Sequence, residues 1–200
     1  MAWVKICGLT TPEDAVMISQ AGANYAGFVF YENSKRNLTK YRAAEIMQFL
    51  PNNIGKIAVV VSPSVRLIKD IEDMGFDAVQ IHGELSQEVL DIAEIPIWRA
   101  YNIEDSLPEI EKSEKIMAYV IDGANYGSGK TFDWSRAANI REKINGRYLI
   151  LAGGLNADNV SEAINAIHPD IVDVSSGVEG EYGKDKYKIE EFIRKVKENG

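Results

Sequence analysis

Two side chains that can transfer protons close β-rich runs in this 200-residue chain: Cys7 ends WVKIC and Asp122 ends MAYVID. A thiol and a carboxyl held at one place could carry general acid–base chemistry. Taken singly, each has a simpler interpretation, because a lone cysteine is often a small buried hydrophobe and an aspartate after a strand is often a turn residue. The convergence of several polar strand ends favours a functional site instead.

Further polar residues share one face of a run with its polar end: Lys5 with Cys7, Gln80 with His82, and Asp173 with Ser175. Strand side chains alternate between two faces, and the residues between these pairs are apolar, so the polar ones point inward. Two interpretations of Lys5 and Asp173 stay open: a buried structural pair, or groups that favour the Cys7 thiolate.

The two histidines are far apart in the predicted arrangement. His82 ends a run, whereas His168 precedes the beginning of another. We interpret His82 as a polar residue near the site and a candidate hydrogen-bond donor. Two isolated histidines do not make a metal site, so we expect no metal.

Glycine-rich turns follow the last two runs, AGGLN at 152–156 and SSGVE at 175–179. Such turns, followed by the start of a helix, form the usual phosphate-binding site of a (β/α)₈ barrel. Each could be an ordinary tight turn on its own. The occurrence of both predicts that a phosphate binds there.

The segment ANYGSGKT, residues 124–131, satisfies a relaxed form of the nucleotide-binding P-loop. It follows the sixth of eight predicted strands rather than a strand of an open sheet, so we interpret the match as accidental. Its glycines are more typical of a loop that closes over a substrate. Lys130 would then supply positive charge near the site, unless it is a solvated loop residue.

Strand-like and helix-like patterns alternate along the whole chain and must position these residues. Helical spacing is clear at 160–167 and 189–196. Asn24, Asp77 and Asp170 occupy similar turns before strands, at multiples of a period of about 25 residues. The eight predicted strands are 3–7, 25–30, 56–61, 78–82, 97–101, 117–122, 147–153 and 170–176.

Alternating strands and helices imply a parallel sheet, and eight units imply a closed (β/α)₈ barrel or a doubly wound open sheet. We favour the barrel, as one compact α/β domain over residues 1–200. In that fold the active site lies at the carboxyl ends of the strands, where Cys7 and Asp122 are predicted.

The composition restricts the partners. A formal net charge of −8 disfavours nucleic acid and anionic membrane. The longest apolar runs are too short to span a bilayer, which requires about 20 residues. One cysteine excludes an internal disulfide, and the first residues do not resemble a signal peptide, so we expect a cytoplasmic protein.

Six segments carry a resemblance: KICGLT, GFVFYENSKR, VQIHG, DGANYGSGKTFDW, LAGGLN with the following DNV, and VDVSSGVE with the following GKDKYKI. Together they resemble the phosphoribosylanthranilate isomerase family of tryptophan biosynthesis. The likeness covers nearly the whole chain, and its first and last segments are the most specific. Glu32 and Lys35 stand where that family often has proline, and Tyr126 stands where glycine is common.

The resemblance implies an Amadori rearrangement of N-(5-phosphoribosyl)anthranilate without metal or cofactor. It implies that Cys7 is the general base, Asp122 the general acid and Arg36 the partner of the anthranilate carboxylate. It places Gly154, Ser176 and Gly177 in the turns that bind the sugar phosphate. The expected partner is this small phosphoribosyl substrate, and the chain is expected to be a monomer or a homodimer.

Three rival functions remain at this stage. The phosphosugar isomerase of histidine biosynthesis performs the same rearrangement in a similar barrel, but that family has an aspartate where this chain has Cys7. The P-loop interpretation predicts magnesium-dependent nucleotide binding. A non-catalytic barrel would bind the substrate without turnover.

Overall fold

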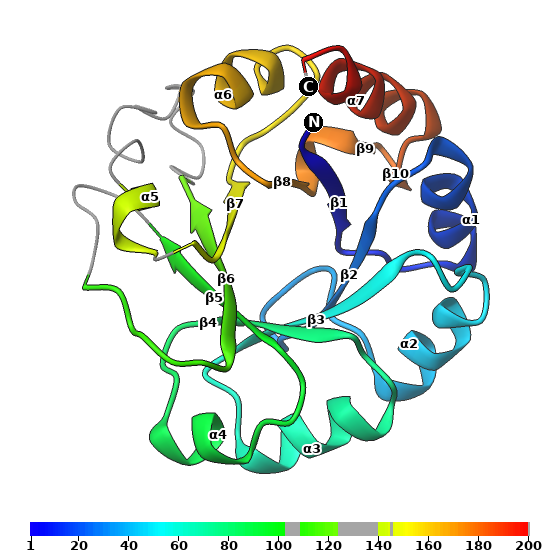
Figure 1. Ribbon diagram of the computed structural model, residues 1–200. Helices are drawn as coiled ribbons and strands as arrows, with labels where there is room; N and C mark the ends of the chain where they lie inside the picture. The colour runs from blue at the N-terminus through cyan, green and yellow to red at the C-terminus, as the bar shows by residue number, and fades with distance from the viewer. Residues whose placement is uncertain (103–108, 124–139, 145, 200) are drawn as a thin grey trace.

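The computed structural model describes residues 1–102, 109–123, 140–144 and 146–199. Lys130 and the P-loop-like segment lie outside these described residues. Eight parallel strands form a closed barrel in which each strand pairs with the next and β8 pairs with β1 (Figure 1). The strands are β1 (Trp3–Cys7), β2 (Tyr25–Phe30), β3 (Gly55–Val61), β4 (Ala78–His82), β5 (Ile97–Asn102), β6 (Ile116–Asp122), β7 (Tyr148–Ala152) and β8 (Ile171–Val174).

This closed order confirms the predicted barrel and excludes the open doubly wound sheet. The strand bounds differ most from the prediction at β8, which ends at Val174. Ser176 begins a short 3-10 helix, η2 (Ser176–Val178), because the backbone at Ser175 leaves the extended conformation with φ −127 and ψ −81. A small antiparallel hairpin of β9 (Glu179–Gly180) and β10 (Gly183–Lys184) follows.

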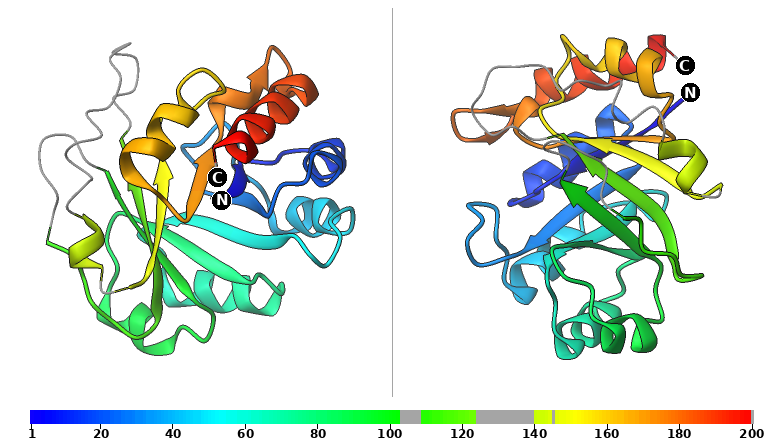
Figure 2. Two further views of the ribbon diagram at one scale, coloured as in Figure 1. Left: turned by 45° about the horizontal axis from the view of Figure 1, so that its top comes forward. Right: turned by 90° about the vertical axis from the view of Figure 1, so that its left-hand side faces the viewer.

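The helices surround the barrel (Figure 2). Each of the longer ones buries one apolar face, as the predicted spacing at Ile189, Phe192, Ile193 and Val196 shows for the last helix. The helices are α1 (Pro12–Ala21), α2 (Lys40–Met47), α3 (Val65–Asp73), α4 (Gln87–Ile92), α5 (Ile140–Lys143), α6 (Val160–Ile167) and α7 (Lys186–Glu198).

The start of α1 is fixed by a capping box. Thr11 Oγ1 accepts a hydrogen bond from Asp14 N at 3.1 Å, and Asp14 Oδ2 accepts one from Thr11 N at 3.0 Å. Pro12 at the first helical position lacks the N–H that would otherwise have no partner there. This local chemistry sets where the chain leaves β1 and therefore how the loop after Cys7 runs.

The described part of the connection between β5 and β6, residues 109–115, contains no helix, and the rest of this connection lies outside the described residues. A polar cluster covers the outer face of these strands there. Arg99 pairs with Glu111 and donates to the carbonyl oxygens of Ile81 at 3.0 Å and Gly83 at 2.7 Å. Tyr119 Oη donates to Glu111 O at 2.7 Å. The side chains of Arg99 and Tyr119 thus make hydrogen bonds to backbone carbonyl groups on a face that a helix covers at other strands of the barrel.

The repeated turns before strands have a common purpose. In each turn, an Asn or Asp side chain accepts a hydrogen bond from a backbone N–H group near the beginning of the preceding strand. This fastens adjacent strands at the bottom of the barrel, which explains the regular spacing. The bonds run from Val4 N to Asn24 Oδ1 at 2.8 Å, from Lys56 N to Asp77 Oδ2 at 2.7 Å, and from Leu149 N to Asp170 Oδ2 at 2.7 Å.

Inside the barrel a small apolar cluster supports a polar layer nearer the mouth. Ala118 and Val120 of β6 belong to the cluster, so Asp122, two residues farther along the strand, continues on the inward side. Lys5, Gln80 and Asp173 are buried polar residues of β1, β4 and β8. The barrel therefore places its ionisable groups beneath one open end.

Candidate active site

Most of the predicted site residues lie at one mouth of the barrel, around the carboxyl ends of the parallel strands. Cys7, His82 and Asp122 are the last residues of β1, β4 and β6. Arg36 lies in the loop after β2, Gly154 follows β7, and Ser176 and Gly177 follow β8. Lys130 lies outside the described residues.

The Cys7 thiol stands above a buried ion pair. Lys5 Nζ donates to Asp173 Oδ2 at 2.6 Å, and Lys5 is completely buried. Burial raises the pKa of Cys7, while the positive charges of Lys5 and Lys184 oppose that rise. Burial alone would lower the pKa of Lys5, but the charges of Asp173 and Cys7 outweigh it and raise that pKa. A charged ammonium thus lies under the thiol.

His82 is linked to the same interior layer. Its Nε2 lies 2.8 Å from Gln80 Nε2, in a hydrogen bond whose direction depends on the ring's tautomer. Burial, together with the charges of Lys5 and Arg99, lowers the pKa of His82 to about 4. Around neutral pH the ring is therefore uncharged, which suits a hydrogen-bonding residue rather than a cation.

We expect the titration of His82 to weaken the fold on acidification. The folded pKa of about 4 lies below the ordinary 6.5, so the unfolded chain binds the proton first and stability falls as the pH drops from 6.5 towards 4. Between pH 6.5 and pH 5 this amounts to roughly 2 kcal/mol. Urea unfolding of the wild type and His82→Gln at several pH values isolates the effect, and an NMR midpoint for His82 near 6.5 would contradict it.

Arg36 makes a two-pronged ion pair that sequence reasoning missed. Its Nε and Nη2 donate to Glu179 Oε1 at 2.5 Å and Oε2 at 2.9 Å. Lys35 and Lys184 also pair with Glu179, each at 3.1 Å. Burial alone would raise the pKa of Glu179, but these three cations lower it to about 2. The mouth therefore already contains a guanidinium arranged to bind a planar carboxylate.

Gly8 makes room for this arginine. It adopts φ +77, and a Cβ at this position would lie 2.3 Å from Arg36 Cδ. The Arg36 side chain therefore lies directly on the backbone that follows Cys7. Ser175 Oγ donates to Cys7 O at 2.9 Å, and Lys184 Nζ donates to Ser175 O at 3.0 Å. Residues after β1, β2 and β8 are joined in one network.

The turns after β7 and β8 touch each other. A Cβ on Gly177 would lie 1.9 Å from Leu155 O, so only glycine allows this approach. Asn159 supports the first turn, since its Nδ2 donates to Gly154 O at 3.0 Å and its Oδ1 accepts from Asn156 N at 2.9 Å. Gly154 itself adopts φ +65. The two glycine-rich turns form one continuous surface.

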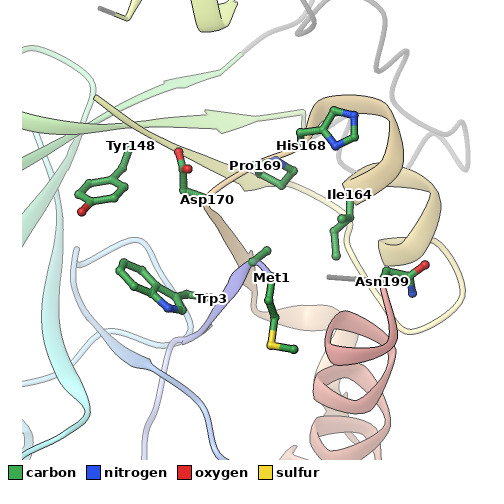
Figure 3. Close-up of a pocket in the computed structure, with 9 residues that line it drawn as sticks. Met1, Trp3, Tyr148, Ile164, His168, Pro169, Asp170 and Asn199 are labelled. Carbon is green, nitrogen blue, oxygen red and sulfur yellow. The ribbon is translucent and has the colours of Figure 1, made fainter. Parts of the chain in front are cut away.

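A cavity of about 430 Å³ lies at the other end of the barrel, away from this mouth (Figure 3). It is lined by residues from the beginnings of β1 and β7 and from the segment before β8, including Trp3, Tyr148 and His168. The two histidines consequently lie at opposite ends. Within the described residues, no group of three His, Cys, Asp or Glu side chains could hold a metal ion.

No helix within the described ranges is both long and apolar enough to cross a membrane.

Comparison with known proteins agrees with the fold. The sequence model of the family described as "N-(5'phosphoribosyl)anthranilate (PRA) isomerase" matches residues 4–195. The chain is 41% identical over 199 residues to N-(5'-phosphoribosyl)anthranilate isomerase of Streptococcus gordonii, with 99% of each covered. It is 39% identical over 208 residues to that of Aquifex aeolicus, covering 98% of this chain and 99% of the relative.

Solved structures extend the likeness to three dimensions. The phosphoribosyl anthranilate isomerase of Thermotoga maritima superposes with a TM-score of 0.85 at 35% identity, covering 99% of this chain and 100% of the other. A phosphoribosyl anthranilate isomerase in complex with reduced 1-(O-carboxyphenylamino)-1-deoxyribulose 5-phosphate gives 0.82 at 34% identity, with the same coverage. On this full-length agreement of sequence and fold, the chain belongs to the N-(5'-phosphoribosyl)anthranilate isomerase family.

Proposed function

We propose that this protein converts N-(5'-phosphoribosyl)anthranilate into 1-(2-carboxyphenylamino)-1-deoxyribulose 5-phosphate, an Amadori rearrangement in tryptophan biosynthesis. Membership of the family over residues 4–195 is the observation that carries the proposal. The mouth of the barrel supports it, because it combines a thiol, a carboxyl, an arginine fork and two glycine-rich turns.

Asp122 acts first, as the general acid. It protonates the ring oxygen of the ribose while the anthranilate nitrogen forms a double bond to C1, which opens the ring and gives an iminium ion. To do so, the carboxyl must carry its proton before the substrate reacts. Its position at the end of β6, on the inward side of the barrel, supports this role.

Cys7 acts second, as the general base. The thiolate removes the proton from C2 of the sugar, and the electrons of that bond neutralise the iminium to give an enolamine. The enolamine tautomerises by moving the hydroxyl proton at C2 to C1, which yields the ketone. No atoms are gained or lost by the substrate, and the proton that Cys7 takes up must return to Asp122 before the next turnover, so acid and base are the only reactive groups the rearrangement requires.

The remaining mouth residues hold the substrate in this proposal. Arg36 binds the anthranilate carboxylate with the two donors that now contact Glu179. Gly154, Ser176 and Gly177 bind the sugar phosphate through backbone N–H groups, an arrangement favoured where a helical turn begins. His82 contributes a neutral hydrogen-bonding group. Lys130, beyond the described residues, would add positive charge from the loop after β6.

Changing Arg36 to Lys is expected to lower kcat/KM by about 10- to 100-fold, mainly through KM. Lysine keeps the charge but cannot make two parallel bonds to a planar carboxylate. The matched control is Lys35→Gln, since Lys35 also pairs with Glu179 but is largely exposed. Steady-state kinetics check the prediction, and an Arg36→Lys enzyme with wild-type KM would rule out this binding role.

One assay tests the function itself. Consumption of N-(5'-phosphoribosyl)anthranilate is followed by its fluorescence, with and without a chelator, and we expect turnover in both. Turnover of only the histidine-pathway substrate would reject the assignment, and substrate binding without turnover would favour a non-catalytic barrel. Calorimetry with MgATP and MgGTP is expected to show no heat of binding, which would reject the P-loop interpretation.

For assembly, the proposal is a monomer or a homodimer in the cytoplasm with no nucleic acid or membrane partner. The net charge of −8 supports the absence of nucleic acid. One related structure, from Thermotoga maritima, is of monomers generated from a dimeric phosphoribosylanthranilate isomerase, so both assembly states occur among relatives. Light scattering coupled to gel filtration distinguishes the two assembly states.

A further inference from the structure

The geometry beneath Cys7 brings one cation close to two acidic groups. In the barrel register Lys5 pairs with Asp173 of β8, and Cys7 pairs with Gly27 of β2. A Cβ on Gly27 would lie 2.7 Å from Cys7 Sγ, so the sulfur fills the space that this glycine leaves. The thiol is held against β2 on the side of the barrel where Lys5 and Asp173 meet.

The Lys5–Asp173 pair is poorly explained as a device for stability alone. Buried ion pairs are often no better for stability than apolar residues of the same size. This pair also leaves Asp173 Oδ1 buried with no hydrogen-bond partner in the described part of the chain. Lys5 carries three donor hydrogens, and one of them contacts Asp173. An ammonium in this position can serve a second acceptor.

We propose that Lys5 is a positioning residue, a counter-ion shared between Asp173 and Cys7. Its charge makes the buried thiolate of Cys7 easier to form, and Asp173 limits that effect by drawing the same charge to itself. Lys184 of β10 is a further charged group that acts on Cys7, and the charge of Lys5 acts in turn on His82 of β4. The role given to Cys7 rests on the proposed function, whereas the charge arrangement does not.

The test follows the ionisation of Cys7 in the free protein. Cys7 is the only cysteine in the chain, so its alkylation by iodoacetamide can be measured between pH 6 and pH 11 without interference from another thiol. The variants are Asp173→Asn, which leaves the Lys5 charge without its acidic partner, and Lys5→Met/Asp173→Asn, which removes both charges. Lys40→Met is the control, because it takes a lysine from a distant ion pair with Asp70.

We expect the alkylation midpoints to follow a fixed order: Asp173→Asn lowest, the wild type in the middle and the double variant highest. Charge changes at this range move such midpoints by about one pH unit or more. A thiol of lower pKa gives more thiolate at a fixed pH, but that thiolate is less nucleophilic. A shift of one pH unit in the midpoint therefore corresponds to about a threefold change in alkylation rate at a fixed pH below the midpoint. Lys40→Met should match the wild type.

If the Lys5–Asp173 pair were purely structural, the alkylation experiment would give a different result. Loosened packing would make both variants react faster without separating their midpoints, and that outcome, or any reversed order, overturns the proposal. Circular dichroism confirms that each variant is folded during the measurement. If Asp173→Asn does not fold, the wild type and the double variant still decide, since the double variant must have the higher midpoint. Alkylation needs no turnover, so failure here is distinct from failure of the proposed function.

Discussion

Replacing Cys7 with Ser, or Asp122 with Asn, is expected to lower kcat by roughly 10³-fold or more while the substrate still binds. General acid–base groups contribute about 10²- to 10⁴-fold each. A serine hydroxyl is too weak an acid to supply the base that removes the proton at C2. Asparagine keeps the shape of Asp122 but cannot protonate the ring oxygen.

Two measurements check this prediction. Single-turnover kinetics separate the chemical step from binding, and calorimetry with a reduced form of the product reports affinity in the absence of turnover. Both variants should bind this compound within a few-fold of the wild type. If either variant turned over at nearly the wild-type rate, its residue could not have the proposed role. If kcat held but KM rose, the residue would be a binding group instead.

The interior of this site follows from strand periodicity. Lys5 and Asp173 are 168 residues apart in the chain. Their contact is nevertheless predictable, because both lie in regular strands of known phase and closure makes the first and last strands neighbours. The same reasoning applies to Cys7 and Asp122, because each lies two residues after an inward-facing residue of its strand, Lys5 and Val120 respectively. Alternation fixes the direction of a side chain wherever the backbone is extended.

The rim of the site does not follow in this way. Glu179 meets Arg36 across 143 residues, but both lie outside the eight barrel strands. Their directions depend on the tight backbone at Gly8 and on the hairpin that sets Glu179 opposite Lys184. Only the appearance of Glu179 in the SSGVE turn could have drawn attention to it. The contact of Gly177 with Leu155 O depends likewise on how two separate turns pack.

The described part of the connection after β5, residues 109–115, has no helix for a similar reason. A periodic pattern indicates where an amphipathic helix can form, but it does not show whether the outer face of a strand pair needs one. Arg99 is buried on this face and donates to the carbonyl oxygens of Ile81 in β4 and of Gly83 just after β4, which reduces the apolar surface that a helix would cover. Sequence alternation alone cannot distinguish a helix from such a polar cover.

A second large effect is expected in stability: Lys5→Met should lower the free energy of unfolding by about 3–5 kcal/mol at neutral pH. The change leaves Asp173 as a buried carboxyl without its cation, and its Oδ1 already has no partner among the described residues. The protein must then either hold an unpaired charge in the barrel or bind a proton there. Both alternatives destabilise the folded state.

Equilibrium urea unfolding measures the loss, and Lys5→Met/Asp173→Asn is the informative comparison. Removing both charges abolishes the unpaired carboxylate, so the double variant should recover at least half of the stability lost in Lys5→Met. Exposed ion pairs contribute little, so Lys186→Met, which breaks a surface pair with Glu190, should change stability by less than about 1 kcal/mol. A double variant as unstable as Lys5→Met would show that packing around the lysine stem, rather than the buried charge, stabilises this part of the barrel.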